Sequence, residues 1–526
     1  MKAVMFTFRK FRSIMDLKEF HESCQAAIEF SINYAKSLRD VDVLPNVEPG
    51  YLLKLLPETA PEKPETFQEV LKDVEKYIIP GLTHWRSPHF HAFCPGGYSN
   101  PSFIGEIISN TFASIGLSWH ACPAATELEV IVMNWVGKLL HLPKEFLNCS
   151  EGFGGGSIQG SASESTFLSL VIARETAVVR TKRLHPEWDE HFIRSKLVAY
   201  SSDQSNSSIE KAGKIATVLL RLLPSDDKGS LRGDTFLKAV EEDLEEGLIP
   251  FCLIATLGTT PTCGFDKLDE LGPICKMHNI WIHIDAAYAG TAFVCPEYRH
   301  LMSGIEYCDS FNFNAHKWML VHFDCSLLWL KDSRKITEIY NVERIYLDNN
   351  KVEIIPEYRH WQLSLGRRFR ALKLWFVLRM IGVEGIREHV RRLIRLMKIF
   401  ENYVKFDNRF EIIGEPSMSL TCFRIKGDDK LTEELHRRLT ADRKLFLTIG
   451  AFKDKVMIRF MVASAITEEW DITFAWNEIT RYTAEILQSV AIPVKENSQE
   501  CFTKSTTDVA MKMEQLNLEL NLHKIS

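Results

Sequence analysis

A lysine follows directly on a short apolar segment in the middle of the chain. In residues 310–318, Ser-Phe-Asn-Phe-Asn-Ala-His-Lys-Trp, polar and apolar residues alternate as far as Asn314, which is typical of a β-strand that runs to the edge of a sheet. Lys317 stands just beyond this strand, beside His316. A lysine at the end of a buried strand is uncommon unless it is paired or used in chemistry. Lys317 is therefore either a surface lysine or a nucleophile, and one use of such an amine is a Schiff base with the aldehyde of pyridoxal phosphate.

Two further predicted strands also end in polar residues. Asp285 ends the apolar segment 281–285, and the segment 251–256 leads into the hydroxyls of Thr256, Thr259 and Thr260. Open parallel sheets bind ligands at the carboxyl ends of their strands. An acid at that edge either caps the next helix or pairs with a positive group, and the protonated ring nitrogen of pyridoxal phosphate is such a group.

A glycine-rich stretch supplies a candidate anion site. Residues 152–156 read Gly-Phe-Gly-Gly-Gly, and residues 159–165, Gln-Gly-Ser-Ala-Ser-Glu-Ser, lead into a predicted helix. Small residues let backbone N–H groups approach an anion, and a helix N-terminus favours negative charge. The stretch lacks the Gly-Lys-Ser/Thr of a P-loop, the full dinucleotide spacing and a predicted strand immediately before it. An acid, hydroxyls, a lysine and an anion site together favour pyridoxal phosphate far more than any one of them does.

The elements that must position these residues form a regular series. Short apolar segments are mostly separated by helix-length stretches, which predicts a largely parallel sheet covered by helices. These segments are 197–200, 251–256, 281–285, 310–314 and 325–330. Helices are expected at 16–38, 67–77 and 127–140, and again at 370–380 and 385–403. Short strands near 418–425 and 456–462, followed by a helix from Glu468, predict a small C-terminal α+β domain.

Composition limits the class of protein. The chain has 526 residues, a net charge of -6 and a pI of about 6.3, so its charge does not point to nucleic acid. No apolar run reaches the ~18 residues that would cross a membrane. Twelve scattered cysteines, without a Cys-x-x-Cys pair or a secretory signal, indicate reduced thiols in a cytoplasmic protein. His89 and His91 have a spacing that a metal accepts, but no acid or cysteine completes a ligand set, so no metal is expected.

Five motifs are spread over most of the chain. They are Ser-Trp at 118–119 with Pro123 and Thr-Glu-Leu-Glu at 126–129, Gln-Gly-Ser-Ala-Ser-Glu at 159–164, Asp-Ala-Ala-Tyr-Ala-Gly at 285–290, Asn-Phe-Asn-Ala-His-Lys at 312–317, and Arg-His-Trp at 359–361 with Leu-Gly-Arg-Arg-Phe-Arg at 365–370. From about residue 15 to about residue 487 the sequence resembles the group II pyridoxal-phosphate decarboxylases, most closely the insect aromatic-L-amino-acid decarboxylase branch.

The resemblance implies the α/β fold of aspartate aminotransferase, which is fold type I of the pyridoxal-phosphate enzymes. That fold has a mostly parallel seven-stranded sheet with helices on both faces, an N-terminal helical segment and a small C-terminal α+β domain. The expected divisions are an extension at 1–14, a helical dimerisation segment at 15–99, a large cofactor-binding domain at 100–373, a small domain at 374–494 and a loose tail at 495–526. The resemblance also implies a homodimer whose two active sites lie at the subunit interface.

The same resemblance implies roles for individual residues. Lys317 forms the Schiff base with pyridoxal phosphate, and Asp285 pairs with the pyridinium nitrogen. Tyr346 matches a tyrosine that reprotonates the α-carbon after CO2 leaves. The other cofactor-binding residues are Ala162, Ser163, Thr260, Ala287, Asn314 and His316. The residues expected to contact the substrate are Trp85, Phe93, Cys94, Pro95, Ile115, Leu117, Tyr288 and Gly366, with Ile115 and Leu117 reaching the site of the other subunit.

The most informative departure from the family pattern is Asn206. Amine-forming relatives carry histidine at this position, stacked over the cofactor ring, whereas asparagine resembles the insect aromatic acetaldehyde synthases. Histidine offers a proton near neutral pH and a flat ring, and an amide offers neither. The implied reaction is decarboxylation with oxidative deamination by O2, which converts L-dopa to 3,4-dihydroxyphenylacetaldehyde, CO2, NH3 and H2O2. The alternative is that asparagine at position 206 has no effect on the reaction, and that the product is the amine, dopamine or tyramine.

The substrate expectation rests on the pocket. Gly366 stands where histidine-specific relatives carry serine, which favours an aromatic substrate. The family usually has a bulky aromatic residue at Cys94, threonine at Gly96 and phenylalanine at Leu117, so this pocket is expected to be roomier. L-Dopa is the first choice, with tyrosine, phenylalanine and tryptophan as alternatives.

Overall fold

A large sheet and a small sheet organise the chain. The computed structural model describes residues 16–94, 96–148, 152–340 and 355–491. Both sheets belong to the compact unit Met1–Thr483, and residues 484–526 form a second unit. The finer division of the chain into five segments remains a prediction.

The large sheet has seven strands in the order β1-β7-β6-β5-β4-β2-β3. The five neighbours from β6 to β3 are parallel, whereas β7 pairs antiparallel with both β6 and β1. The strands are β1 (Gly155–Gln159), β2 (Leu197–Ser202), β3 (Leu219–Leu223), β4 (Ile249–Thr256), β5 (Trp281–Asp285), β6 (Ser310–Asn314) and β7 (Ser326–Leu330). Every residue of β2, β5, β6 and β7 is buried, as expected for strands covered on both faces. The predicted mostly parallel, seven-stranded sheet is confirmed.

Two strands of the large sheet, β1 and β3, were not predicted from the sequence. β5 and β6 have the predicted bounds, and β2, β4 and β7 differ from them by one or two residues. β1 begins within the glycine-rich stretch, which the sequence analysis treated as a loop, and its first two residues are glycines of that stretch. A Cβ on Gly156 would lie 2.7 Å from the ring of Trp329. Close packing therefore requires a glycine inside this strand, although glycine in a sequence usually indicates a loop. β3 is a partly exposed edge strand with leucines on both faces.

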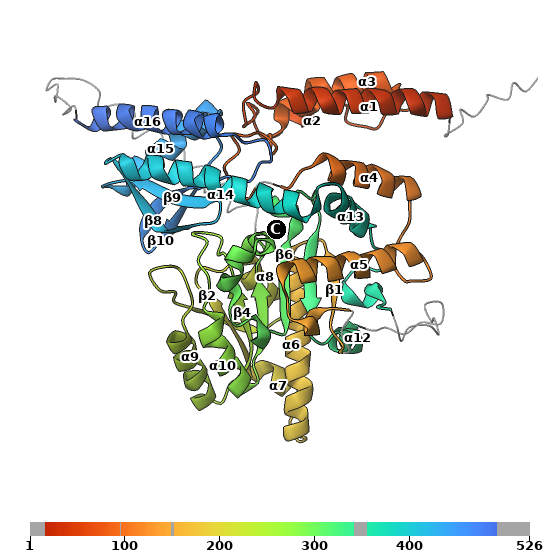
Figure 1. Ribbon diagram of the computed structural model, residues 1–526, viewed down its shortest axis with the longest axis vertical. Helices are drawn as coiled ribbons and strands as arrows, with labels where there is room; N and C mark the ends of the chain where they lie inside the picture. The colour runs from red at the N-terminus through yellow and green to blue at the C-terminus, as the bar shows by residue number, and fades with distance from the viewer. Residues whose placement is uncertain (1–15, 95, 149–151, 341–354, 492–526) are drawn as a thin grey trace, which may run out of the picture. The chain divides into compact units, whose positions relative to one another are not determined.

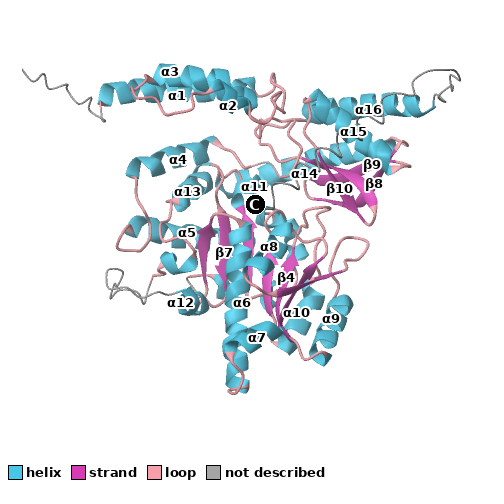
Figure 2. Cartoon of the chain, turned by 180° about the vertical axis from the view of Figure 1, so that it is seen from behind, coloured by secondary structure: helices cyan, strands magenta, loops and turns pink. Residues whose placement is uncertain are grey.

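Helices cover the sheet on both faces. Seen from opposite sides, α5 and α10 cross in front of the sheet in Figure 1 and α6 crosses in front of it in Figure 2. α6 packs on β4 to β7, α5 packs on β1, and α10 packs on β4 and β5. The helices of this part are α4 (Asn100–Phe112), α5 (Pro123–Leu140), α6 (Ala162–Leu184), α7 (Glu190–Lys196), α8 (Ser207–Ile215), α9 (Gly233–Glu245), α10 (Leu268–His278), α11 (Ala315–Trp318), α12 (Arg334–Tyr340) and α13 (Arg370–Met380).

The C-terminal part of the first unit is built on an antiparallel sheet. Four strands lie in the order β10-β11-β9-β8, and α14 and α15 pack on them. The elements are α14 (Gly382–Phe406), β8 (Phe410–Ser417), β9 (Leu420–Ile425), α15 (Asp429–Asp442), β10 (Thr448–Phe452), β11 (Lys455–Met461) and α16 (Glu469–Ala491). β9, β11 and α16 match the predicted segments to within two residues at the predicted ends, and β8 and β10 were not predicted. The α+β character expected of this region is confirmed.

The N-terminal segment is helical, as predicted. It contains α1 (Leu17–Ser37), capped by Asp16, together with α2 (Tyr51–Leu55) and α3 (Phe67–Asp73). α1 buries none of its residues within the chain, and its apolar side chains Leu17 and Phe20 are 76% and 66% exposed. None of the helices in the described ranges is long and apolar enough to cross a membrane.

Candidate active site

The polar last residues of β4 and β5 lie in one row with Asn312 of β6. Thr256 of β4 is the register partner of Asp285 of β5, and Asp285 is the partner of Asn312 of β6. The chain continues this pairing past the strands, since Leu257 N donates to Asp285 O and Ala286 N donates to Asn312 O, both at 2.9 Å. The residues that follow these ends therefore meet at one edge of the sheet, as the sequence predicted.

The carboxylate of Asp285 is buried at this edge and only partly satisfied. The residue is 4% exposed, and its Oδ1 accepts a hydrogen bond of 2.9 Å from Ala287 N. In the described ranges no donor reaches Oδ2. Burial raises the pKa of Asp285, and the positive charge of Lys317 and the Ala287 hydrogen bond oppose that rise. A buried carboxylate with a free oxygen is costly unless a positive or proton-bearing group joins it.

Lys317 projects from the short helix α11, directly after β6. Its neighbour His316 is buried and accepts a hydrogen bond on Nδ1 from Cys325 N at 2.8 Å. Burial lowers the pKa of His316 to about 4, so the ring is neutral near pH 7 and carries its proton on Nε2. The loop at Gly97 closes over this segment, because Gly97 N donates to His316 O at 2.6 Å. His316 thus offers one N–H donor beside the lysine.

The N-terminus of α6 supplies further donors. Ser161 caps this 23-residue helix by accepting from Glu164 N, and Gly160 N donates to the side chain of Glu164. Ala162 and Ser163 are the first two helical residues, whose N–H groups have no acceptor inside a helix. Asn314, the last residue of β6, has a buried amide oxygen without a partner in the described structure. Turning that amide by 180° places an NH2 donor there, so this side chain is also available to an anion.

Asn206 links the end of β2 to the loop after β4. It caps α8 by accepting a hydrogen bond on Oδ1 from Ser208 N at 3.0 Å. Its Nδ2 donates to the hydroxyl of Thr260 at 2.9 Å. The amide is therefore held at both ends, and it stands beside a hydroxyl that the sequence assigned to the same site.

Aromatic side chains border the loop over the strand ends. Trp85 and Phe93 stack with ring centroids 5.8 Å apart, and both are about half exposed. Burial raises the pKa of Cys94 to about 11, and the charges of Lys317 and Arg459 oppose the rise, which places this thiol within electrostatic reach of the lysine. Of these predicted substrate residues, Cys94 is thus placed near Lys317, and Phe93 precedes it in the chain.

Tyr288 is buried below this edge and is held from the C-terminal part. Its hydroxyl hydrogen-bonds Ser419 Oγ at 2.8 Å, and its ring stacks on Trp318 with centroids 5.2 Å apart. Trp318 Nε1 donates back to Tyr288 O at 2.6 Å. Tyr288 is therefore a fixed wall rather than a mobile contact.

The predicted substrate residues Ile115, Leu117 and Gly366 form a separate group. A Cβ on Gly366 would lie 3.3 Å from Ile115 Cγ2, and Gly116 N donates to Arg367 O at 3.0 Å. Arg367 itself is buried in an ion pair with Glu129. The backbone hydrogen bond of this group runs to Arg367, and the side chain of Ile115 is 59% exposed within the single chain.

Comparison with known proteins gives the family. Residues 49–426 match the pyridoxal-dependent decarboxylase conserved domain. The chain is 50% identical to an aromatic-L-amino-acid decarboxylase of Drosophila simulans over 90% of this chain and 93% of that protein. It is also 50% identical to the 3,4-dihydroxyphenylacetaldehyde synthase of Drosophila melanogaster, over 88% and 92% of the two chains.

The chain belongs to the pyridoxal-dependent decarboxylase family. Its fold agrees, since the crystal structure of Oryza sativa TDC with PLP and tryptamine superimposes with a TM-score of 0.87 at 33% identity, covering 90% of this chain and 99% of that one. The cofactor of the family is pyridoxal phosphate, as the sequence predicted.

The residues at the sheet edge fit this cofactor. The free oxygen of Asp285 suits a protonated ring nitrogen, and a buried carboxylate needs such a partner. The exposed N–H groups at the start of α6, the neutral His316 and the unsatisfied amide of Asn314 suit a phosphate. Lys317 supplies the amine.

Two predicted residues, Pro95 and Tyr346, lie outside the described residues. Two residues with structural roles at this site were missed by the sequence reading. Asp266 is buried and accepts from Thr256 N and Leu231 N, both at 2.7 Å, so it fixes the loop that carries Thr260. Ser419 holds Tyr288 from the turn between β8 and β9 of the other sheet. Neither residue lies in a motif, and only the folded chain brings them to the site.

Proposed function

We propose that this decarboxylase acts on an aromatic L-amino acid, L-dopa first, and that it is an aldehyde synthase. In this reaction L-dopa, O2 and water give 3,4-dihydroxyphenylacetaldehyde, CO2, NH3 and H2O2. Two electrons leave the substrate and reduce O2 to peroxide. The names of both Drosophila relatives support an aromatic substrate, and their equal identity to this chain leaves the product to be argued from the site.

The observation that carries the proposal is the fixed amide of Asn206. Its two hydrogen bonds, to Thr260 and to Ser208 N, occupy both ends of the side chain. An amide does not release a proton near neutral pH, and one that is held at both ends does not swing to do so. The residue at this position therefore supplies no acid where amine-forming relatives are expected to carry histidine.

The other side chains have roles that both products share. Pyridoxal phosphate, when bound, supplies an electron sink for the bond that breaks as CO2 leaves. Lys317 would supply the amine that attaches the cofactor, and Asp285 would hold a proton on the ring nitrogen. Ala162, Ser163, Asn314 and His316 would hold the phosphate, and Thr260 would interact with the ring hydroxyl. Trp85, Phe93, Cys94 and Tyr288 enclose the aromatic side chain of the substrate.

Product choice is a competition between a proton and O2 for the same electrons. A difference of about 1.4 kcal/mol between two barriers changes a product ratio tenfold. A single side chain can supply such a difference by placing a proton or by closing one face to O2. Asn206 supplies no proton, which favours O2.

The test is to measure amine, aldehyde, CO2 and peroxide in one reaction with L-dopa. We expect the parent enzyme to release about one peroxide per CO2, and Asn206→His to raise the amine fraction and lower O2 uptake per CO2. Asn477→His, on the exposed part of α16, is the matched control and should behave as the parent does. Cys94, Gly96 and Leu117 also shape the pocket, so the change in the Asn206 variant need not be complete.

The alternative is a plain aromatic-L-amino-acid decarboxylase. It predicts that the parent already releases mostly amine, without peroxide, and that Asn206→His leaves this outcome unchanged. That result would remove the aldehyde synthase from consideration while keeping the decarboxylation.

We also propose that the enzyme is a homodimer. The exposed apolar side chains of α1 and α4 need a covering surface, and Ile115, a predicted substrate residue, is 59% exposed within one chain. Ile115 would then complete the site of the second subunit. Sedimentation of the purified enzyme should give twice the chain mass of 60.4 kDa, and a monomeric active enzyme would contradict the proposal.

A further inference from the structure

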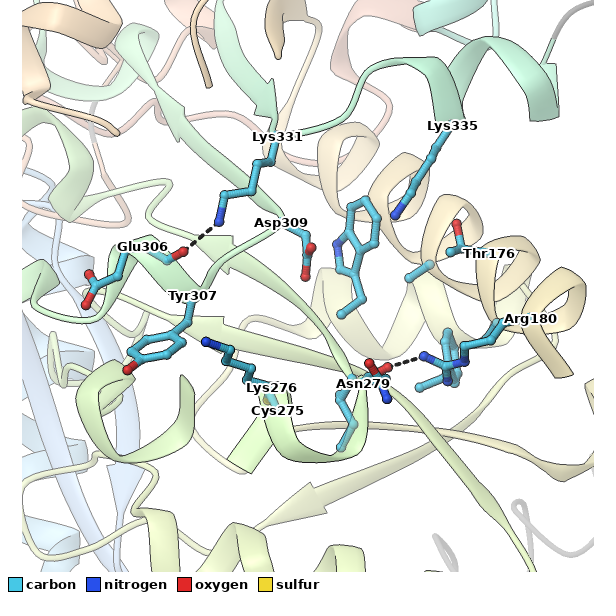
Figure 3. A pocket seen from close by; sticks show the side chains of 15 residues that line it. Thr176, Arg180, Cys275, Lys276, Asn279, Glu306, Tyr307, Asp309, Lys331 and Lys335 are labelled. Carbon is cyan, nitrogen blue, oxygen red and sulfur yellow. Dashed lines mark hydrogen bonds between the residues drawn. The ribbon is translucent and has the colours of Figure 1, made fainter. Parts of the chain in front are cut away.

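A cavity of about 580 Å³ lies at the opposite ends of the large sheet's central strands from the site described above. It is bordered by Trp281, the first residue of β5, by the residues between α10 and β5, and by Lys331 directly after β7. Figure 3 shows Lys331 and Lys335 on one side of it and Arg180 and Asn279 on the other. Its volume lies within the range of about 300–1,000 Å³ that is usual for small-molecule sites. Asp285, the last residue of the same strand, belongs to the active-site edge.

Positive side chains dominate the lining. Four cations border the cavity, Arg180, Lys276, Lys331 and Lys335, against two carboxylates, Glu306 and Asp309. Over the ranges that the structure describes, none of the four cations has a carboxylate oxygen within 4.0 Å. Their charges are therefore not compensated by ion pairs inside the chain.

Neutral partners hold three of these cations in place. Lys331 Nζ donates to Glu306 O at 2.6 Å, and Lys335 Nζ lies 5.0 Å from the centre of the Trp281 ring. Arg180 donates to the carbonyl of Asn279. Carbonyls and rings orient a cation without cancelling its charge, and they leave other N–H donors of the same group available. Burial lowers the pKa of Arg180, which is the expected response of a cation without a counter-ion.

Helix ends explain only part of this charge. Lys276 lies in the last turn of α10, and Arg180 bonds the carbonyl that follows that helix, so both cations interact favourably with a helix C-terminus. Lys335 lies in the first turn of α12, where a positive charge is unfavourable. Lys331 lies outside any helix. The two lysines need another reason for their position.

Asp309 is the acid nearest to these lysines. Its Oδ2 accepts from Ile282 N at 2.9 Å, and Lys335 and Lys331 influence it electrostatically from beyond ion-pair distance. Because this carboxylate already accepts a hydrogen bond from the backbone of β5, it neutralises the positive charge of the two lysines only in part.

We propose that this cavity binds a small polyanion, a compound with several phosphate or carboxylate oxygens that bridge Lys331, Lys335 and Arg180. The cations line one cavity, keep unused donors and lack internal counter-ions, which is the arrangement that such a ligand completes. The inference does not depend on which product the active site forms.

The experiment is calorimetric titration of the cofactor-saturated enzyme with two probes, inorganic pyrophosphate and citrate. Saturation with pyridoxal phosphate fills the phosphate site at the start of α6, so the probes cannot bind there. We expect saturable binding of at least one probe, at one site per chain, and the preferred probe tells phosphate from carboxylate recognition. The double variant Lys331→Gln/Lys335→Gln should bind at least about tenfold more weakly, because two charge-assisted contacts are lost.

Lys238→Gln is the matched control, since Lys238 is an exposed lysine of α9 outside the cavity and should leave binding unchanged. A second measurement uses the parent alone and does not depend on the folding of a variant. Acetylation mapped by mass spectrometry should show that the probe protects Lys331 and Lys335 but not Lys238. Absence of saturable binding by the parent, equal affinity in the double variant, or absence of protection would each overturn the proposal.

Discussion

Asn206 and Thr260 are joined by a hydrogen bond of 2.9 Å that runs from the amide nitrogen to the hydroxyl. It connects the loop after β2 with the loop after β4, and these two strands are neighbours in the sheet. Since the other end of the same amide caps α8, one side chain couples the helix, the loop and the active-site edge. The stability of α8 and the position of the Thr260 loop therefore both depend on Asn206.

Replacing Asn206 by alanine is expected to destabilise the protein by about 1–2 kcal/mol. The loss combines an N-cap, worth about 1 kcal/mol, with one net hydrogen bond. Asn206→Asp keeps the cap and should lose less than half as much. Urea unfolding at equal protein and cofactor concentrations measures both. Equal stability of the alanine variant and the parent would show that neither bond contributes.

Lys317→Ala should abolish turnover and leave the fold intact. The amine acts as a nucleophile, and its side chain is only partly buried, so little packing is lost. Borohydride should fix the cofactor to the parent chain but not to the variant, and CO2 release should fall to background. Lys238→Ala on α9 is the control with full activity. Substantial turnover by the Lys317 variant at the same cofactor content would contradict the assignment of Lys317 as the residue that binds the cofactor covalently.

Asp285→Ala should weaken cofactor binding by about 10–100-fold and nearly stop decarboxylation. One charge-assisted hydrogen bond in a shielded site contributes about 1.5–3 kcal/mol, which corresponds to that factor. Cofactor titration followed by absorbance gives the affinity, and CO2 release gives the rate. Asp269→Ala, at an exposed position of α10, should change neither. A near-normal rate in the Asp285 variant would place the ring nitrogen elsewhere.

Asp266 should make the protein less stable as the pH rises toward 7. Burial raises its pKa from the ordinary value of 3.8 to about 7, and two backbone N–H groups oppose the rise. Between these two values the unfolded chain has lost the proton that the native chain still binds, so the free energy of unfolding falls with rising pH. From pH 5.5 to pH 7.5 the group should remove about 2 kcal/mol.

The check is urea unfolding of the parent and of Asp266→Asn at both pH values. The variant should be less stable at pH 5.5, because its amide accepts only one of the two N–H groups. The free energy of unfolding of the variant should also lack the part of the pH dependence that Asp266 contributes. Parallel pH curves for the two proteins would mean that Asp266 does not titrate in this range.

The strand ends were predictable because they obey local rules. Lys317 and Asp285 follow short, continuously apolar runs, and such runs mark buried parallel strands in any context. β1 was not predictable in the same way, because Gly156 packs against Trp329 of the neighbouring strand and Gly155 against Asn148 and Trp361, and no local pattern reveals these contacts. The same limit applies to Asp266 and Ser419. Both act through partners far away in the sequence, and their local surroundings are those of ordinary loop residues.

The capping role of Asn206 has a consequence for how these activities diverge. Codons for asparagine and histidine differ by one base at the first position, so a single point mutation exchanges the two residues. The exchange also removes the asparagine cap of α8, a cost of about 1 kcal/mol that a fold with 5–15 kcal/mol of stability tolerates. With the role proposed above for Asn206, an ancestral gene would shift from aldehyde toward amine formation in one step, without a compensating second mutation to keep the protein folded.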